Sequence, residues 1–267
     1  LSATVYLLRA LQQRGVAPQQ LESRFELVSS VGSEIFLEVA KWRALRVLWA
    51  SLWAPLRAER SIASSQPTPI TPQLTGVSAR WSRTQDDPHT NLLRITASAM
   101  SCIIAGVDRV ELYPFLLRGD KEESFARHLI PRLQQVMTHE SWLTSVADPG
   151  GGSFYVEHLT EQLALASWEL FQKHERAGGI AALIDSSALQ TEVRAAAAQR
   201  IASFESAETL LIGLNKFRES GSPERRDVYS RQELTAQRIA ELPEPRSLST
   251  RNPDQIIAAA RAGASAA

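Results

Sequence analysis

The chain repeats one pattern four times: a short run typical of a β-strand, then a loop, then a longer run with helical spacing. The strand-like runs lie at residues 24–30, 74–80, 109–113 and 143–148. The runs with helical spacing lie at about 34–53, 88–105, 122–138 and 155–175. Strands that alternate with helices of this length indicate βα units, because parallel strands need a long crossover connection. The sequence therefore predicts an α/β protein with a parallel sheet.

The first of the helical runs is the longest, and its apolar residues recur at the spacing of one helix face. Trp42, Trp49 and Trp53 follow that spacing, so we interpret them as residues that pack the helix against the protein rather than as a stacking platform for a ligand. A second helix start is visible at Asp87, because an acidic residue before Pro88 is typical of an N-cap followed by proline in the first turn.

The remainder of the chain changes character twice. After Gly178 and Gly179 the pattern is helical and alanine-rich, and a short extended run is expected at 210–215. From Glu219 the chain is polar and interrupted by proline, which is typical of an extended tail or linker. We therefore divide the chain into βα units over residues 1–176, a helical linker over 177–218 and a largely irregular tail over 219–267.

Composition excludes several classes of protein. The 267 residues carry a net charge of +0, so no basic field attracts nucleic acid. The sequence has no run of 18 apolar residues that would span a membrane. Cys102 is the single cysteine, which permits no internal disulfide, and we expect it in the core. These features are consistent with a cytoplasmic protein. Because the chain opens at Leu1 directly in a helix-like pattern, we expect it to be cut from something longer.

Five short motifs occur in a fixed order along the chain. They are the run from Phe36 to Ala50, Trp81-Ser-x-Thr84 with Asp87-Pro88-x-x-Asn91-x-x-Arg94, the run from Asp148 to Thr160, Glu175 with Gly178-Gly179, and Gly213-Leu-Asn-Lys-Phe217. In this order they resemble the motifs of the methylmalonyl-CoA mutase family. The resemblance covers residues 7–218, approximately.

The resemblance implies a fold and a chemistry. Members of this family bind an acyl-CoA along the axis of a (β/α)₈ barrel of the TIM type. A separate domain holds adenosylcobalamin through a D-x-H-x-x-G motif, and the cofactor rearranges the carbon skeleton that links methylmalonyl-CoA and succinyl-CoA. By this comparison the chain corresponds to about the last four βα units of the barrel, followed by the linker.

The departures from the family pattern concern the residues of the active site. None of the five histidines lies in D-x-H-x-x-G, so adenosylcobalamin is expected in the complex but not on this chain. Thr75 stands where catalytic members have a histidine at the substrate carbonyl, and a hydroxyl cannot act as a protonatable imidazole. Glu111-Leu112-Tyr113 replaces a His-Thr-Asn sequence. This form resembles the small, non-catalytic subunit of heterodimeric bacterial mutases.

No catalytic or metal-binding residue is therefore assigned. The candidate substrate-facing residues are Thr75, Ser78, Arg80, Glu111 and Tyr113. The glycine run 150–152 could bind an anion through its backbone amides, but we favour a tight turn that needs unusual backbone angles.

We interpret the chain as a small subunit that pairs with a cobalamin-binding catalytic subunit, with the acyl-CoA substrate bound in the complex. Two alternatives stay open. One is a catalytic barrel whose cobalamin domain lies on a separate polypeptide, and an active barrel should then present a substrate-binding histidine at Thr75 or within 111–113. The other is a non-functional fragment.

Overall fold

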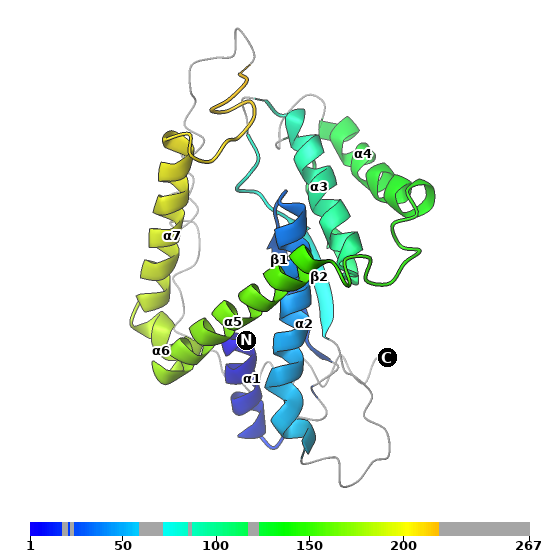
Figure 1. Ribbon diagram of the computed structural model, residues 1–267. Coiled ribbons are helices and arrows are strands. Elements are labelled where there is room, and N and C mark those ends of the chain that lie inside the picture. The colour runs from blue at the N-terminus through cyan, green and yellow to red at the C-terminus, as the bar shows by residue number, and fades with distance from the viewer. Residues whose placement is uncertain (18–20, 22–23, 59–71, 85–86, 117–122, 219–267) are drawn as a thin grey trace. The chain divides into compact units, whose positions relative to one another are not determined.

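The structure is a computed structural model that describes residues 1–17, 21, 24–58, 72–84, 87–116 and 123–218 (Figure 1). The chain divides into two units, Leu1–Ser222 and Pro223–Ala267, and all the described residues belong to the first. The predicted βα region and helical linker both fall within this first unit. The predicted tail over 219–267 lies outside the described residues.

The described residues contain a three-stranded parallel sheet in the order β1 (Glu26–Val31), β2 (Gln73–Ser78) and β3 (Arg109–Glu111). The strands pair without offset, so that Thr75 lies between Val28 and Arg109. Strand order follows chain order, and each strand is followed by a helix. The first three predicted βα units are thereby confirmed, although β3 ends two residues earlier than the sequence indicates.

The fourth predicted strand is wrong, because residues 143–148 form turns and bends. The Ser145 amide donates to the Trp142 carbonyl over 3.0 Å, which closes a turn. Trp142 and Asp148 have φ of 54° and 48°, outside the extended region. A strand needs a neighbouring ladder, and among the described residues this segment has none. The expected half-barrel of four units is therefore an open sheet of three strands, and closure into a barrel is not shown.

The helices follow the predicted runs to within a few residues. They are α1 (Ser2–Gln12), α2 (Ile35–Ala58), α3 (Thr90–Ile104), α4 (Glu123–Gln135) with the π-helical turn η3 (Val136–Glu140), α5 (Phe154–Arg176), α6 (Gly179–Asp185) and α7 (Ala188–Glu205). Asp87 Oδ1 accepts the Thr90 amide at 3.2 Å, as a capping carboxylate would, but α3 begins at Thr90 with His89 as its N-cap, so the helix starts two residues later than predicted. Past α7, the expected extended run is reduced to a single bridge between Ile212 and Lys216.

The main core lies between the sheet and α2, with α3 beside it (Figure 1). Trp42 and Cys102 are buried there, as predicted from their spacing and type. A side chain at Gly76 would collide with the Cys102 sulfur, so glycine allows β2 and α3 to approach closely.

A second cluster covers the other end of α2. Trp49 and Trp53 are each 1% exposed, and both pack edge-on against Phe25, with ring centroids 5.4 and 6.1 Å apart. The interpretation of these tryptophans as helix-packing residues is confirmed. The cluster joins α2 to Leu8 of α1.

Candidate functional site

Three of the candidate residues meet where β2 and β3 end. The Tyr113 amide donates to the Ser78 hydroxyl oxygen at 2.9 Å, which links the last residue of β2 to the segment that follows β3. The Arg80 guanidinium lies 4.0 Å from the centroid of the Tyr113 ring. In parallel α/β folds this carboxyl edge is where ligands bind, because loops with polar groups converge there.

Arg83 also belongs to this group, although the sequence analysis did not single it out. Its guanidinium lies 5.4 Å from the Tyr113 ring and donates to the Pro114 carbonyl at 2.8 Å. Burial lowers the pKa of the Arg83 guanidinium, and the like charge of Arg80 lowers it further. Two arginines on one tyrosine ring form a positively charged surface suited to an anionic group. No sequence signal identified it, since Arg83 occupies the variable position of Trp81-Ser-x-Thr84.

Thr75 lies deeper in the sheet and is already bonded. It is the third residue of β2 and is 2% exposed. Its hydroxyl donates to Glu26 Oε1 on β1, and Glu26 also lies 3.5 Å from the Arg109 guanidinium on β3. Glu26 therefore links the three strands through side chains, and Thr75 is one of its two partners.

Glu111 shares a sheet face with Thr75 rather than with Ser78. It is paired in register with Val77, and side chains two residues apart on a strand point the same way. Glu111 is exposed at the end of β3. The five candidates thus divide into a pair on the face opposite the main core, Thr75 and Glu111, and a group of three around Tyr113.

One buried amide fixes the loops that carry the second group. Asn91 of α3 is 0% exposed and its Nδ2 donates to the carbonyls of Thr84 and Phe115, at 2.8 and 3.1 Å. Its Oδ1 accepts the Thr84 amide at 3.0 Å and the Arg94 guanidinium at 2.8 Å. The Asn and Arg of the second motif are therefore residues that shape the site rather than contact a ligand.

The glycine run 150–152 forms a turn. Gly151 donates to the Asp148 carbonyl at 2.9 Å, and Gly152 has a φ of +78°, which favours glycine. The Gly152 amide donates to Glu157 Oε1 at 3.0 Å, and Arg43 pairs with both Asp148 and Glu157. These bonds, the Gly152 amide first among them, lower the pKa of Glu157. The Gly152 amide, which could have bound an external anion, is therefore already bonded to the Glu157 carboxylate of the same chain.

A polar cavity of about 860 Å³ lies between the start of α2 and α7. Glu38 and Lys41 line it from α2, and Trp81 lines it from the loop after β2. Arg200 of α7 lies over the Trp81 ring at 4.5 Å from its centroid. The cavity is large enough for a small ligand and adjoins the Arg80 loop.

The five histidines are His89, His128, His139, His158 and His174, and none lies in a D-x-H-x-x-G motif. The histidines are spread over separate places, and His174 is bonded to Glu192 at 3.2 Å on the outer helices. Within the part of the chain that the structure describes, no three histidine, cysteine, aspartate or glutamate side chains gather as a metal site would need.

Comparison with known proteins gives the class of this α/β chain. A family model described as methylmalonyl-CoA mutase matches residues 1–264. The chain belongs to the methylmalonyl-CoA mutase family, which is a family of isomerases that use adenosylcobalamin.

The individual relatives include both kinds of subunit. The small subunit of methylmalonyl-CoA mutase from Porphyromonas gingivalis is 31% identical over 79% of this chain and 33% of its own length. The small subunit from Streptomyces virginiae is 31% identical over 81% of this chain and 34% of its own length. The large subunit from Streptomyces virginiae is 32% identical over 80% of the chain and 28% of its own length. The chain spans about a third of the length of these relatives.

Among the helices that the structure describes, none has the length and apolar character that crossing a membrane requires.

Proposed function

We propose that this chain is part of the small, non-catalytic subunit of an adenosylcobalamin-dependent mutase that interconverts methylmalonyl-CoA and succinyl-CoA. Its role is to support a catalytic subunit that holds the cobalamin and turns over the acyl-CoA. The relatives named as small subunits support the pairing, because a small subunit implies a large one.

The observation that carries the non-catalytic role is the state of Thr75. The position that the family resemblance assigns to a substrate-binding histidine holds a buried hydroxyl that donates to Glu26. A hydroxyl occupied in this way offers neither a proton at neutral pH nor a free donor to a substrate carbonyl. Within this proposal, the arginines at Tyr113 shape the edge of the sheet and carry no chemistry.

A catalytic chain with its cobalamin domain on another polypeptide is the second candidate. The observation that favours it is the identity to a large subunit, which at 32% is as high as the 31% identity to a small subunit of the same organism. A non-functional fragment is the third, and the reading frame around this segment distinguishes it from the other two.

The test is turnover of the complex assembled from the full-length subunit that carries this sequence and its cobalamin-binding partner. Thr75→Val keeps the side-chain shape and removes the hydroxyl, and it should change turnover less than twofold. A hundredfold loss in a variant that still assembles corresponds to about 2.7 kcal/mol of transition-state stabilisation, and it would assign an active site to this chain. An absorbance titration of the separated subunits should place cobalamin on the partner.

A further inference from the structure

The segment that follows α7 folds into a compact turn over residues 211–216. The Asn215 side chain closes this turn, because its Oδ1 accepts the Leu211 amide at 2.7 Å and its Nδ2 donates to two earlier main-chain carbonyls at 2.9 and 2.8 Å. Leu211 and Leu214 are each 9% exposed, so one side of the turn is buried. The 211–216 turn lies beside the start of α3 (Figure 1).

Two contacts join the 211–216 turn to the start of α3. The Arg94 guanidinium donates to the Ile212 carbonyl. Gly213 has a φ of +81°, and a methyl group built on it would lie 2.5 Å from the Cβ atom of Asp87. Glycine therefore allows the turn to approach α3 this closely, and any larger residue would push it away.

The α3 side of both contacts also holds the loops of the candidate site. Arg94 donates to Asn91 Oδ1 at 2.8 Å, and the Asn91 amide binds the main chain of Thr84 and Phe115. The Asp87 carbonyl accepts the Thr84 hydroxyl at 3.1 Å. Thr84 and Asn91 are each 0% exposed, so these bonds are made away from water. Two series of direct contacts therefore lead from the turn to the loop after β2.

Arg94 depends on the turn for one of its acceptors. Its side chain is buried, and burial lowers the pKa of its guanidinium. Within the described residues its two hydrogen-bond acceptors are neutral, namely Asn91 Oδ1 and the Ile212 carbonyl. Loss of the Ile212 carbonyl would leave a buried cationic donor unpaired, which is unfavourable. We therefore expect the Arg94 side chain to shift when the turn is released, and its bond to Asn91 to weaken.

We propose that the 211–216 turn acts as a latch on the candidate site, with Arg94 as the positioning residue. While the turn contacts α3, the loop after β2 and the segment after β3 are both held. When the turn is released, both loosen together, and with them the group of Arg80, Arg83 and Tyr113. Because the turn leads along the chain towards Pro223–Ala267, it provides a route from that unit to the candidate site. The proposal holds whether or not the chain is a small subunit.

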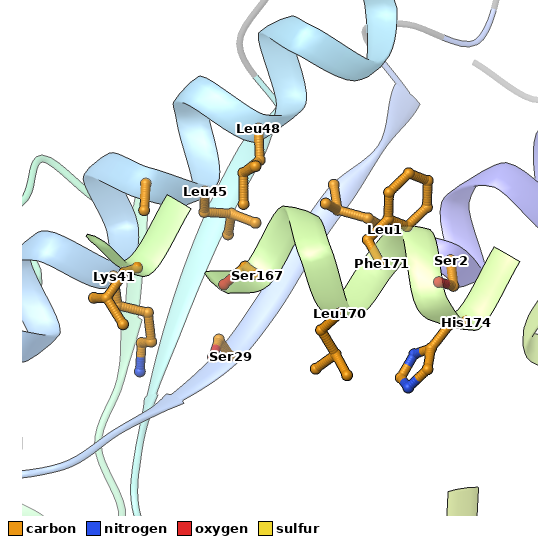
Figure 2. A pocket seen from close by; sticks show the side chains of 12 residues that line it. Leu1, Ser2, Ser29, Lys41, Leu45, Leu48, Ser167, Leu170, Phe171 and His174 are labelled. Carbon is orange, nitrogen blue, oxygen red and sulfur yellow. The ribbon is translucent and has the colours of Figure 1, made fainter. Parts of the chain in front are cut away.

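Hydrogen exchange followed by mass spectrometry tests the latch in the full-length subunit that carries this sequence. The reporters are the amides of Thr84 and Tyr113, which are bonded to the side chains of Asn91 and Ser78. Exchange around Phe171 of α5 is the internal reference for opening of the whole protein. Figure 2 shows Phe171 lining a cavity with Leu45 of α2, and no residue of the turn lines it.

Gly213→Ala should accelerate exchange of the two reporter amides by about tenfold or more beyond any change at the reference, because it pushes the turn away from Asp87. Gly152→Ala is the matched control. Gly152 has a similar φ of +78°, but a methyl group there meets none of the described atoms within 4 Å. In this variant the reporters should change by no more than about twofold relative to the reference.

A second variant, Asn215→Ala, opens the turn from within and leaves Asp87 and Arg94 unaltered. It should give the same pattern as Gly213→Ala, and it decides the test if Gly213→Ala does not fold. Acceleration confined to the turn, or equal at the reporters and the reference, overturns the latch. An equal effect of Gly152→Ala would trace the result to backbone strain and also overturns it. Circular dichroism of each variant confirms that folded proteins are compared.

Discussion

The close approach of β2 to α3 gives a sharp test of the core. A methyl group built on Gly76 falls well inside the van der Waals radius of the Cys102 sulfur, and it also meets Val31 and Trp42 at 3.4 and 3.5 Å. Gly76→Ala should therefore destabilise the protein, since adding a methyl group to a packed core costs about 1–3 kcal/mol. The reduced freedom of the unfolded chain returns about 0.4–1 kcal/mol, so the expected net loss is about 1–2 kcal/mol.

The same geometry predicts rescue by a second substitution. Cys102→Ala alone should cost about 1 kcal/mol, because it removes one buried heavy atom and leaves a small cavity. In the double variant the new methyl group at Gly76 occupies the space of the sulfur. The two losses should therefore not add, and the coupling free energy should be about 1–2 kcal/mol in favour of the double variant.

Urea unfolding followed by tryptophan fluorescence measures these free energies, and Trp42 reports directly on this part of the core. Gly150→Ala is the control, because a methyl group there meets Val156 at an ordinary 3.4 Å and should change stability by less than about 0.5 kcal/mol. Additive losses in the double variant, or a neutral Gly76→Ala, would refute the packing argument.

Three further predictions concern other parts of the structure. Asn91→Ala should lower the free energy of unfolding by about 3 kcal/mol in urea denaturation, since it leaves several buried backbone groups without partners. Leu93→Ala, at a 69% exposed position of the same helix, is the control and should cost less than about 1 kcal/mol. Burial raises the pKa of the Cys102 thiol to about 12, so alkylation by iodoacetamide at pH 8 should proceed only at the rate of unfolding, and fast labelling of the folded chain would contradict its burial. The pKa of Glu157 is lowered by the Gly152 amide and by Arg43, so the stability from these contacts is present above the unfolded pKa of Glu157 and is lost as pH falls through its folded pKa. Glu157→Gln should therefore make the free energy of unfolding less dependent on pH in that acidic range. An unchanged pH profile would count against the contacts.

Local periodicity was sufficient to predict most of the fold. Helical spacing located α2, α3 and α5, because each buries one face against the same core and the pattern reports that face directly. The tryptophans of α2 were assigned to packing on the same ground. Whether a run forms a strand, however, depends on main-chain hydrogen bonds to a neighbouring strand, and the local sequence does not show which neighbour is present. The run at 143–148 has the composition of a strand, but the described residues provide no strand to pair with it.

The candidate site was predictable in part. Ser78, Arg80 and Tyr113 lie in the predicted strand runs 74–80 and 109–113, and the structure brings them together, while their contact with a substrate stays a prediction. The bond between Thr75 and Glu26 was not predictable, because it joins residues 49 positions apart and depends on the register of β1 against β2. Arg83 was missed for a related reason, since its proximity to the tyrosine arises from the folding of the loop.

The four hydrogen bonds of Asn91 have a consequence for how the edge of the sheet can move. The loop after β2 is held at Thr84 and the segment after β3 is held at Phe115, and both are held by the same side-chain amide. Neither loop can shift alone without breaking a buried bond. A displacement of α3 should therefore be transmitted to both loops at once, while the Ala79 amide, which donates to the Val31 carbonyl at 2.8 Å, holds the start of the first loop on β1.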